Sequence, residues 1–170
     1  IRYATRLRQL RQWGHGERWG SNYKMTKVQA AVGIVQIGRL DEMLAPRVAL
    51  ARARNRLLAD VPELTLPIPP AGYGHTYYLY TLLVPREWAG ERRDRLMQIM
   101  EQEYGVGCVV ANPPCYQSDP FLGSQTPGQR LPLSDELGAR LFCVSIHPLM
   151  TPQQNEYVCA ALMEAVERLR

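Results

Sequence analysis

The run of residues 75–84, HTYYLYTLLV, constrains the fold of this 170-residue chain more than any other feature. It is rich in aromatic and β-branched residues, which favour an extended strand. Apolar side chains occupy both odd and even positions, so we expect both faces of the strand to be covered. Such a strand needs a sheet and helices around it, and the chain is long enough for one domain with a hydrophobic core.

Two further segments read as strands, VGCVVAN at 106–112 and RLFCVSIH at 140–147, and a short one is expected at 64–66. Helical periodicity marks the segments between and around them. The expected helices span 2–13, 26–43, 47–60, 88–104 and the chain after Thr151. This order predicts an α+β fold, a small antiparallel sheet with helices packed on one side.

Two of these helices carry explicit start signals. Thr26 with Gln29, and Thr151 with Gln154, have the spacing of a capping box, in which a threonine oxygen accepts an end amide and the glutamine side chain reaches back. The helix from Thr26 is apolar on most sides, which is typical of a buried helix. We expect Pro46 to break or kink the chain after it.

Residues 113–133 show little periodicity and contain several prolines and glycines. A structureless connection of this length is unusual inside a compact domain, so we expect a functional loop here.

The charge of the chain is uneven. Residues 1–20 carry five arginines against one acidic residue, whereas residues 21–170 hold 15 basic and 15 acidic residues. The arginines of the first helix lie opposite an apolar face, so we expect a solvated face or one that meets an acidic or phosphorylated neighbour, and no nucleic-acid partner.

Several classes of protein are disfavoured by what the sequence contains. We see no apolar run of the length that spans a membrane and no signal peptide. Four scattered cysteines fit buried thiols in a reducing, cytoplasmic protein better than a metal site. The first residue is Ile1, which agrees with a piece of a longer protein. Common nucleotide-binding and hydrolase motifs are missing, so composition and periodicity alone indicate only an α+β domain.

One stretch is more specific: WGSNYKMTKVQAA at 19–31, followed by Gly33, Gln36 and the run 39–42, RLDE. This pattern resembles the DegT/StrS aminotransferases, which are fold-type I, pyridoxal-phosphate (PLP)-dependent enzymes. Four other landmarks resemble the family in the same order: RLRQLRQWGHG, GHTYYLYTLLV, GVGCVVANPPCYQSDPF and CVSIHPLMTPQQNEYV.

The resemblance implies that the chain is the C-terminal part of such an enzyme. Residues 1–45 would be interface and linker helices with a cofactor-contacting turn, and residues 46–170 the small α+β domain. The large PLP domain, with its Schiff-base lysine, would lie outside this chain. Lys24 and Lys27 are the only lysines and neither matches the family's catalytic position, so we expect no catalytic residue here and no transamination by this chain alone.

The resemblance also implies a role for the turn before Thr26. In family dimers it reaches the partner's cofactor phosphate, which assigns cofactor binding to Asn22, Tyr23 and Lys24. An amide, a hydroxyl and an ammonium suit a phosphate. The family usually has arginine where this chain has Lys24, and lysine lacks arginine's bidentate geometry. The alternative is an ordinary helix-entry turn.

Substrate binding is expected in the loop 111–123, where Asn112 and Tyr116 occupy positions that hold histidines or their neighbours in the family. Neither can act as a base near neutral pH, which favours a small polyhydroxylated ring such as an aminocyclitol ketone. His147, at the end of the last strand, is a further candidate. The alternatives are a loop merely stiffened by proline and a structural histidine.

The activity implied is transfer of an amino group from glutamate or glutamine to a keto-sugar or aminocyclitol ketone, at a site completed across a dimer interface. The expected partners are the PLP domain, a second subunit, the ketone and the amino donor, with no membrane. Two alternatives stay open: a non-catalytic subunit of a split aminotransferase, and a dehydrase or aromatising variant of the family.

Overall fold

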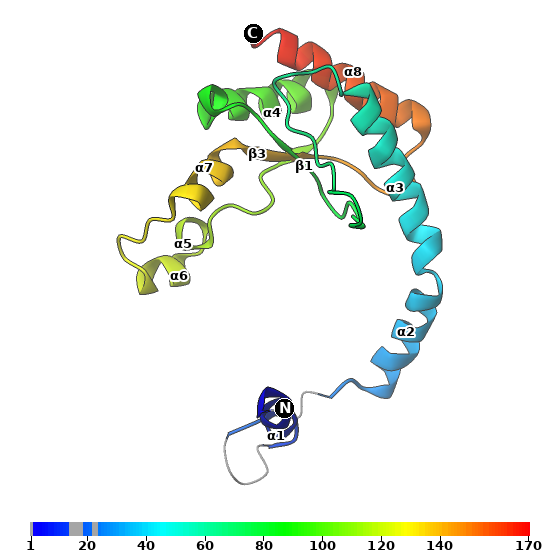
Figure 1. Ribbon diagram of the computed structural model, residues 1–170, viewed down its shortest axis with the longest axis vertical. Coiled ribbons are helices and arrows are strands. Elements are labelled where there is room, and N and C mark those ends of the chain that lie inside the picture. The colour runs from blue at the N-terminus through cyan, green and yellow to red at the C-terminus, as the bar shows by residue number, and fades with distance from the viewer. Residues whose placement is uncertain (1, 14–18, 22–23) are drawn as a thin grey trace. The chain divides into compact units, whose positions relative to one another are not determined.

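The computed structural model describes residues 2–13, 19–21 and 24–170 (Figure 1). The chain forms two compact units, residues 1–41 and 42–170. The first contains α1 (Arg2–Arg11) and α2 (Lys27–Gly38). The second contains nearly all of α3 (Leu40–Leu57), and then, in chain order, β1 (Tyr80–Leu83), the 3-10 helix η2 (Arg86–Trp88), α4 (Glu91–Tyr104), β2 (Cys108–Val109), α5 (Cys115–Ser118), α6 (Pro120–Gln125), α7 (Pro132–Arg140), β3 (Leu141–Val144) and α8 (Pro152–Glu167).

Both predicted capping boxes are confirmed. Thr26 Oγ1 accepts the N–H of Gln29 at 3.2 Å, and Gln29 Oε1 accepts the N–H of Thr26 at 2.8 Å. Thr151 and Gln154 make the same pair of bonds at the start of α8, at 3.1 and 2.8 Å. These bonds satisfy backbone donors that a helix start otherwise leaves unpaired.

The expected break at Pro46 is wrong. The helical path is interrupted at Arg39 instead, where φ is −101° and ψ is 3°, and α3 then runs through Pro46. Gly38 ends α2, and glycine is a poor helix former. Proline inside a helix removes one hydrogen bond, and a helix of 18 residues can tolerate that loss.

The expected burial of the second helix is also wrong for the described chain. No residue of α2 is buried, and its large apolar side chains are more than half exposed. They are Val28, Val32, Ile34, Val35 and Ile37. An apolar surface of this extent on a folded chain marks an interaction site.

The sheet has three antiparallel strands in the order β1-β3-β2. Tyr80 pairs with Val144 and Leu82 with Phe142, so these four side chains share one face, and all four are buried. The strand expected over 75–84 begins only at Tyr80. Tyr77 has a φ of +48°, outside the extended region, and its N–H donates to His75 Nδ1 at 2.9 Å.

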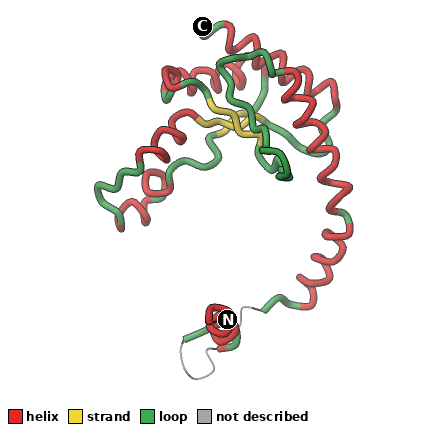
Figure 2. The backbone as a smooth tube through the Cα atoms, viewed as in Figure 1, coloured by secondary structure: helices red, strands yellow, loops and turns green. Residues whose placement is uncertain are grey.

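The core lies between this face of the sheet and helices α3, α4 and α8, which lie on the same side of the strands in Figure 1. Figure 2 shows how much of the second unit is helix and loop around the short strands. The helices and the turn after α3 supply fully or nearly fully buried apolar side chains: Ala51, Leu58, Leu96, Ile99, Met100, Val158, Leu162 and Val166. The predicted α+β class, with a small antiparallel sheet and helices on one side, is confirmed.

The segment 113–133 is not the irregular loop that we expected, because it contains α5, α6 and the start of α7. Asp119 caps α6, since its Oδ1 accepts the N–H of Leu122 at 3.0 Å, and Pro120 occupies the first helical position. An Asp-Pro pair is a helix-start signal that periodicity alone does not reveal in so short a helix.

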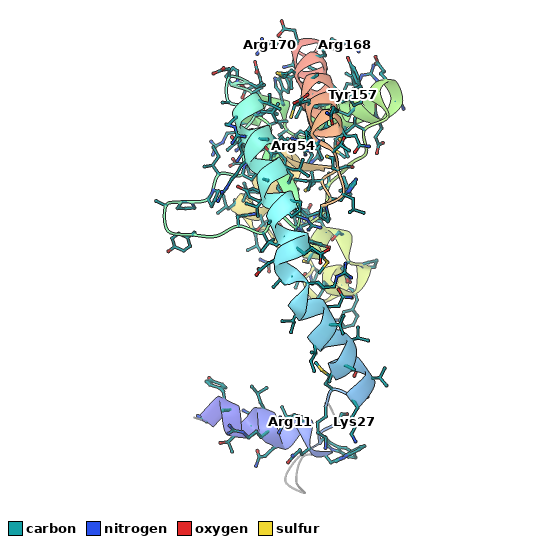
Figure 3. The ribbon with its side chains drawn as sticks, turned by 90° about the vertical axis from the view of Figure 1, so that its right-hand side faces the viewer. Arg11, Lys27, Arg54, Tyr157, Arg168 and Arg170 are labelled. Atoms are coloured by element: carbon teal, nitrogen blue, oxygen red, sulfur yellow. The ribbon has the colours of Figure 1, made fainter. Side chains whose placement is uncertain are left out.

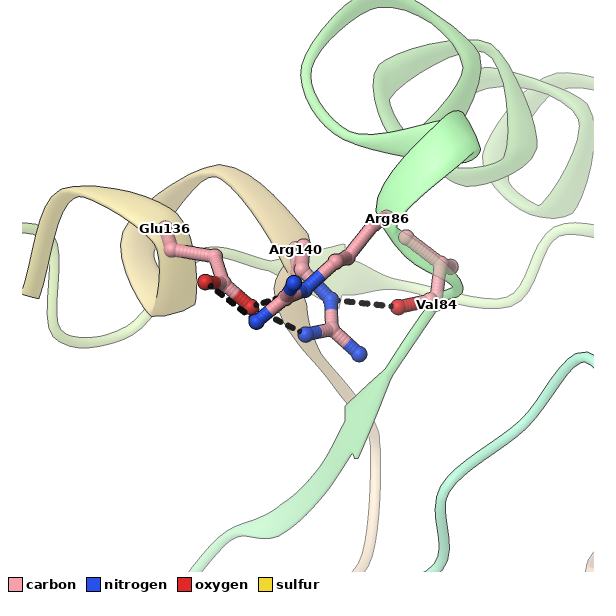
Figure 4. Close-up of polar contacts among 4 residues, drawn as sticks. All are labelled: Val84, Arg86, Glu136 and Arg140. Carbon is pink, nitrogen blue, oxygen red and sulfur yellow. Dashed lines mark hydrogen bonds and ion pairs between the residues drawn. The ribbon is translucent and has the colours of Figure 1, made fainter. Parts of the chain in front are cut away.

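Helix α7 is fastened to the end of β1 by a small ionic cluster (Figure 4). Arg86 donates two hydrogen bonds to the Glu136 carboxylate, at 2.9 and 3.0 Å. Arg140 donates to the same carboxylate at 2.6 Å and to the Val84 carbonyl at 2.8 Å. Glu136 therefore joins α7 to η2, and Arg140 joins α7 to Val84, the residue that follows β1.

Among the described residues, no helix is long and apolar enough to cross a membrane, and no group of three or more histidine, cysteine or acidic side chains is placed to hold a metal. Cys143 and Cys159 are buried, as expected for small apolar side chains, whereas Cys108 is partly buried and Cys115 is exposed.

Replacement of Glu136 by glutamine should lower the stability of the protein in a pH-dependent way. Hydrogen bonds from Arg140 and Arg86 hold the pKa of this carboxyl below its usual 4.5. The stabilisation is therefore present above pH 4.5 and is lost as the pH falls through the lowered pKa. The difference in urea-unfolding midpoint between wild type and Glu136→Gln should shrink below pH 4.5. Glu87→Gln, at an exposed position of η2, is the control and should show no such trend.

Truncation of Leu162 to alanine should destabilise the protein by about 2–5 kcal/mol, because it leaves a cavity in the core beneath the sheet. Leu162 is 0% exposed. The neighbouring Met163 is 38% exposed, so Met163→Ala should cost below about 1 kcal/mol. Equal losses in urea unfolding for the two variants would contradict the packing described.

Candidate functional site

The turn that leads into α2 is the first candidate region. Asn22 and Tyr23 lie outside the described residues. Lys24 is exposed, as are Met25 and Thr26. The N–H of Ser21 donates to the Leu10 carbonyl at 3.0 Å, so the start of the turn is tied to the end of α1. Thr26 ties its other end to α2 through the capping box.

The described part of this turn fits an anion such as a phosphate. The first turn of helix α2 holds no acidic residue. Among the described residues, no partner accepts a hydrogen bond from the backbone N–H groups of Lys27 and Val28. Free N–H groups at a helix start, with the positive end of the helix dipole, favour negative charge. Lys24, two residues before the cap Thr26, is exposed and adds a positive charge to this short segment. These groups can bind and orient a phosphate, but they provide no covalent attachment.

The second candidate region follows β2. Tyr116, on α5, is half-buried, and its hydroxyl donates to the Asp135 carboxylate on α7. The same hydroxyl accepts the N–H of Leu131 at 3.2 Å, and Gln117 Nε2 donates to Asp135 at 2.5 Å. Burial raises the pKa of the Tyr116 hydroxyl, and the bond to Asp135 raises it further. Tyr116 is therefore a neutral donor near pH 7 whose proton is already engaged.

Close packing fixes α5 against α7. A Cβ at Gly138 would lie 2.6 Å from Pro114 Cδ, which is closer than two carbon atoms can approach. Only glycine at this position of α7 allows Pro114 to come so near. Pro114 and Tyr116 thus both anchor the segment, and the tyrosine has a structural role whatever else it binds.

The other two predicted substrate residues are exposed. Asn112 lies in the connection between β2 and α5, and His147 lies just beyond β3, where its carbonyl accepts the N–H of Met150 at 3.1 Å. No hydrogen bond in the described chain joins Asn112, Tyr116 and His147 to one another. Because β2 and β3 are antiparallel, with Cys108 opposite Val144 and Val109 opposite Cys143, Asn112 and His147 follow opposite ends of this strand pair. The structure therefore does not bring the three predicted residues together.

A cavity of about 340 Å³ opens at the ends of β2 and β3. It is lined by Tyr78, Leu79, Gly107, Cys108, Val109, Cys143, Val144, Ser145 and Ile146. Its lining residue Ile146 directly precedes His147, whereas Val109 lies three residues before Asn112. The volume suits a small molecule. Desolvation raises the pKa of the Cys108 thiol to about 12, so this sulfur is not a nucleophile near neutral pH.

The sequence did not point to Asp135 or Ser145. Asp135 holds Tyr116 and Gln117 from 19 and 18 residues away along the chain. Ser145 Oγ donates to the Gly107 carbonyl at 2.9 Å and so joins the two strand ends beside the cavity. Both are common polar residues without a motif, and only the tertiary pairing of their segments gives them a role.

The α+β fold matches a part of fold-type I aminotransferases. A sequence model of the DegT/DnrJ/EryC1/StrS aminotransferase family matches residues 2–163. The chain belongs to this family, as its motifs indicated.

Several solved structures share the fold, among them the aminotransferase TlmJ. DesV from S. venezuelae is 27% identical, with a TM-score of 0.80 over 97% of this chain. TlmJ from Streptoalloteichus hindustanus is 22% identical, with a TM-score of 0.78 over 99%. NtdA from Bacillus subtilis, which was solved with the cofactor PMP bound, is 22% identical, with a TM-score of 0.75 over 88%. This chain spans only 44%, 46% and 34% of those three chains.

Replacement of Tyr116 by phenylalanine should loosen the segment between β2 and α7, because Asp135 and the Leu131 N–H both lose a partner. Hydrogen–deuterium exchange of peptides from residues 113–131 should accelerate, while exchange in α8 stays unchanged. Tyr78→Phe is the matched control, since Tyr78 is 75% exposed. If Tyr116→Phe exchanged no faster than Tyr78→Phe, the anchoring role would be wrong.

Proposed function

We propose that this chain is the C-terminal portion of a PLP-dependent aminotransferase that moves an amino group from glutamate or glutamine to a keto-sugar or aminocyclitol ketone. The observation that carries the proposal is the match of an aminotransferase family across residues 2–163. When bound, the cofactor supplies the carbonyl and amine chemistry that carries the amino group. The residues of this chain bind and orient, and the cofactor is held mainly by residues outside it.

In this proposal the turn before α2 holds the cofactor phosphate across a subunit interface. Asn22 and Tyr23 donate hydrogen bonds, and Lys24 contributes its charge. The support is the exposed ammonium of Lys24 beside the free N–H groups at the start of α2. The capping box fixes Thr26, so the end of the turn that enters α2 is already held in place when the phosphate binds.

The second region binds the ketone substrate. Asn112 and His147 are exposed and offer hydrogen bonds to the hydroxyl groups of a sugar or cyclitol ring. The Tyr116 hydroxyl already donates to Asp135 and accepts from Leu131, so only one lone pair is left for a substrate hydroxyl. The cavity of about 340 Å³ beside β2 and β3 is lined as far as Ile146, the residue before His147.

The partners proposed are a lysine-bearing PLP domain and a second subunit. The exposed apolar side chains of α2 support this, because a helix that is apolar on most sides is stable when other polypeptide covers it. The coverage of less than half of each related structure fits the same proposal.

A non-catalytic subunit of a split enzyme is a second candidate, favoured by the presence of only two lysines in the chain. Borohydride reduction of the purified protein with PLP, followed by peptide mapping, separates the two. The first proposal expects a cofactor-modified lysine on the polypeptide that contains this chain, at neither Lys24 nor Lys27. The split-subunit proposal expects that lysine on a separate polypeptide.

Replacement of Lys24 by alanine in the assembled enzyme should raise the dissociation constant for PLP by about tenfold, since a charge-assisted contact of about 1.5 kcal/mol is lost. Asn22→Ala should also weaken binding. Lys27→Ala removes the other lysine, which lies inside α2, and should have a smaller effect. Cofactor release followed by absorbance or fluorescence measures the three constants, and equal affinities in all variants would sink the phosphate role.

A further inference from the structure

A charged side chain lies at the centre of the second unit. Arg54, on α3, is 0% exposed, and none of the described acidic side chains forms an ion pair with it. Its guanidinium lies 4.7 Å from the centre of the Tyr80 ring, and its Nη1 has no hydrogen-bond partner. Figure 3 labels Arg54 on the part of α3 that runs beside α8.

A buried charge without a carboxylate is costly to the fold. Burial lowers the pKa of the Arg54 guanidinium from its usual value, which reflects the same cost. Cation–π contact with Tyr80 offsets only a part of it. An apolar side chain of similar size would fill this position at a lower free-energy cost. The role of the arginine therefore lies in the groups to which its N–H donors bind.

Those donors reach both ends of one short segment. Nη2 donates to the Ser145 carbonyl at 3.0 Å and approaches Met150 Sδ at 3.6 Å. Residues 145–150 form the connection from β3 to α8, and His147 lies exposed inside it. Nε donates to Asn155 Oδ1 at 3.0 Å, and Asn155 Nδ2 donates in turn to the Leu50 carbonyl at 3.2 Å. The guanidinium thus ties α3, the segment and α8 together.

We propose that Arg54 is a positioning residue, whose guanidinium holds both ends of residues 145–150 and so fixes the place of His147. The part of this inference that concerns catalysis rests on the proposed substrate-binding function of His147. A planar fork of donors can reach acceptors on two elements at once, whereas the single ammonium of lysine cannot do so with the same geometry.

The test compares Arg54→Met with Arg52→Met, which removes an exposed arginine from the same helix. Hydrogen–deuterium exchange on the full-length protein reports on the segment directly, because the N–H of Met150 donates to the His147 carbonyl within it. In Arg54→Met, exchange in residues 145–150 should accelerate by about tenfold or more, which corresponds to loss of one local hydrogen bond. Exchange in the later part of α8, around the buried Leu162 and Val166, should not change, and Arg52→Met should match wild type.

If Arg54→Met does not fold, Arg54→Lys takes its place, since it keeps the charge and most of the volume. It should also accelerate exchange in residues 145–150. Unchanged exchange in the folded variant would overturn the proposal.

Kinetics of the assembled enzyme test the link to His147. Arg54→Met should raise KM for the ketone more than it lowers kcat, and adding His147→Asn should cause little further loss, because both changes act on one contact. Additive losses would overturn the positioning role. If His147→Asn alone leaves KM unchanged, the proposed function of His147 fails, and the exchange experiment still decides whether Arg54 holds the segment.

Discussion

Burial of one face of strand β3 is the interaction on which the second unit depends. Phe142 and Val144 lie on that face, and their antiparallel neighbours Tyr80 and Leu82 extend it. Helix α8 covers it with a continuous apolar stripe, and α3 and α4 complete the layer. The candidate segments are extensions of this arrangement: β2 leads to Asn112 and α5, and β3 leads to His147. Because the sheet has only three strands, the end of each strand directly sets where the segment that follows it begins.

The two units differ in how far their apolar side chains are exposed. Residues 42–170 bury theirs in a core of their own, whereas α2 exposes valines and isoleucines along its length. One unit with its own core and another with an exposed apolar helix are typical of a domain joined to an interface element. This contrast supports the proposal that the chain acts inside a larger assembly, and it is consistent with membership of a family whose solved members are about twice as long.

Much of the fold could be predicted because its signals are local. The capping boxes at Thr26 and Thr151, the end of α4 at Gly105 and the three strands are all visible in a few consecutive residues. Gly105 has a φ of +64°, the left-handed conformation that ends helices and favours glycine. The errors arose where local signals compete: Pro46 is tolerated inside α3, Tyr77 shortens β1, and Asp119 starts a helix too short to show a period.

The polar contacts around the candidate site could not be predicted from the sequence, for a different reason. Arg54 and Asn155 are 101 residues apart, and Tyr116 and Asp135 face each other only because α5 packs on α7. No spacing rule links such pairs. The turn at 19–26, in contrast, drew its functional interpretation from a resemblance to one family, and that family is the one whose model matches the chain.

The central claim, that this chain completes an aminotransferase, is tested most directly by following the amino group itself. The full-length protein that contains this chain is incubated with PLP, amino-15N-labelled glutamate or amide-15N-labelled glutamine, and a panel of keto-sugars and aminocyclitol ketones. Mass spectrometry of the products should find the label on at least one of these ketones. Cofactor-loaded protein that moves no label from either donor to any ketone of the panel would contradict the account.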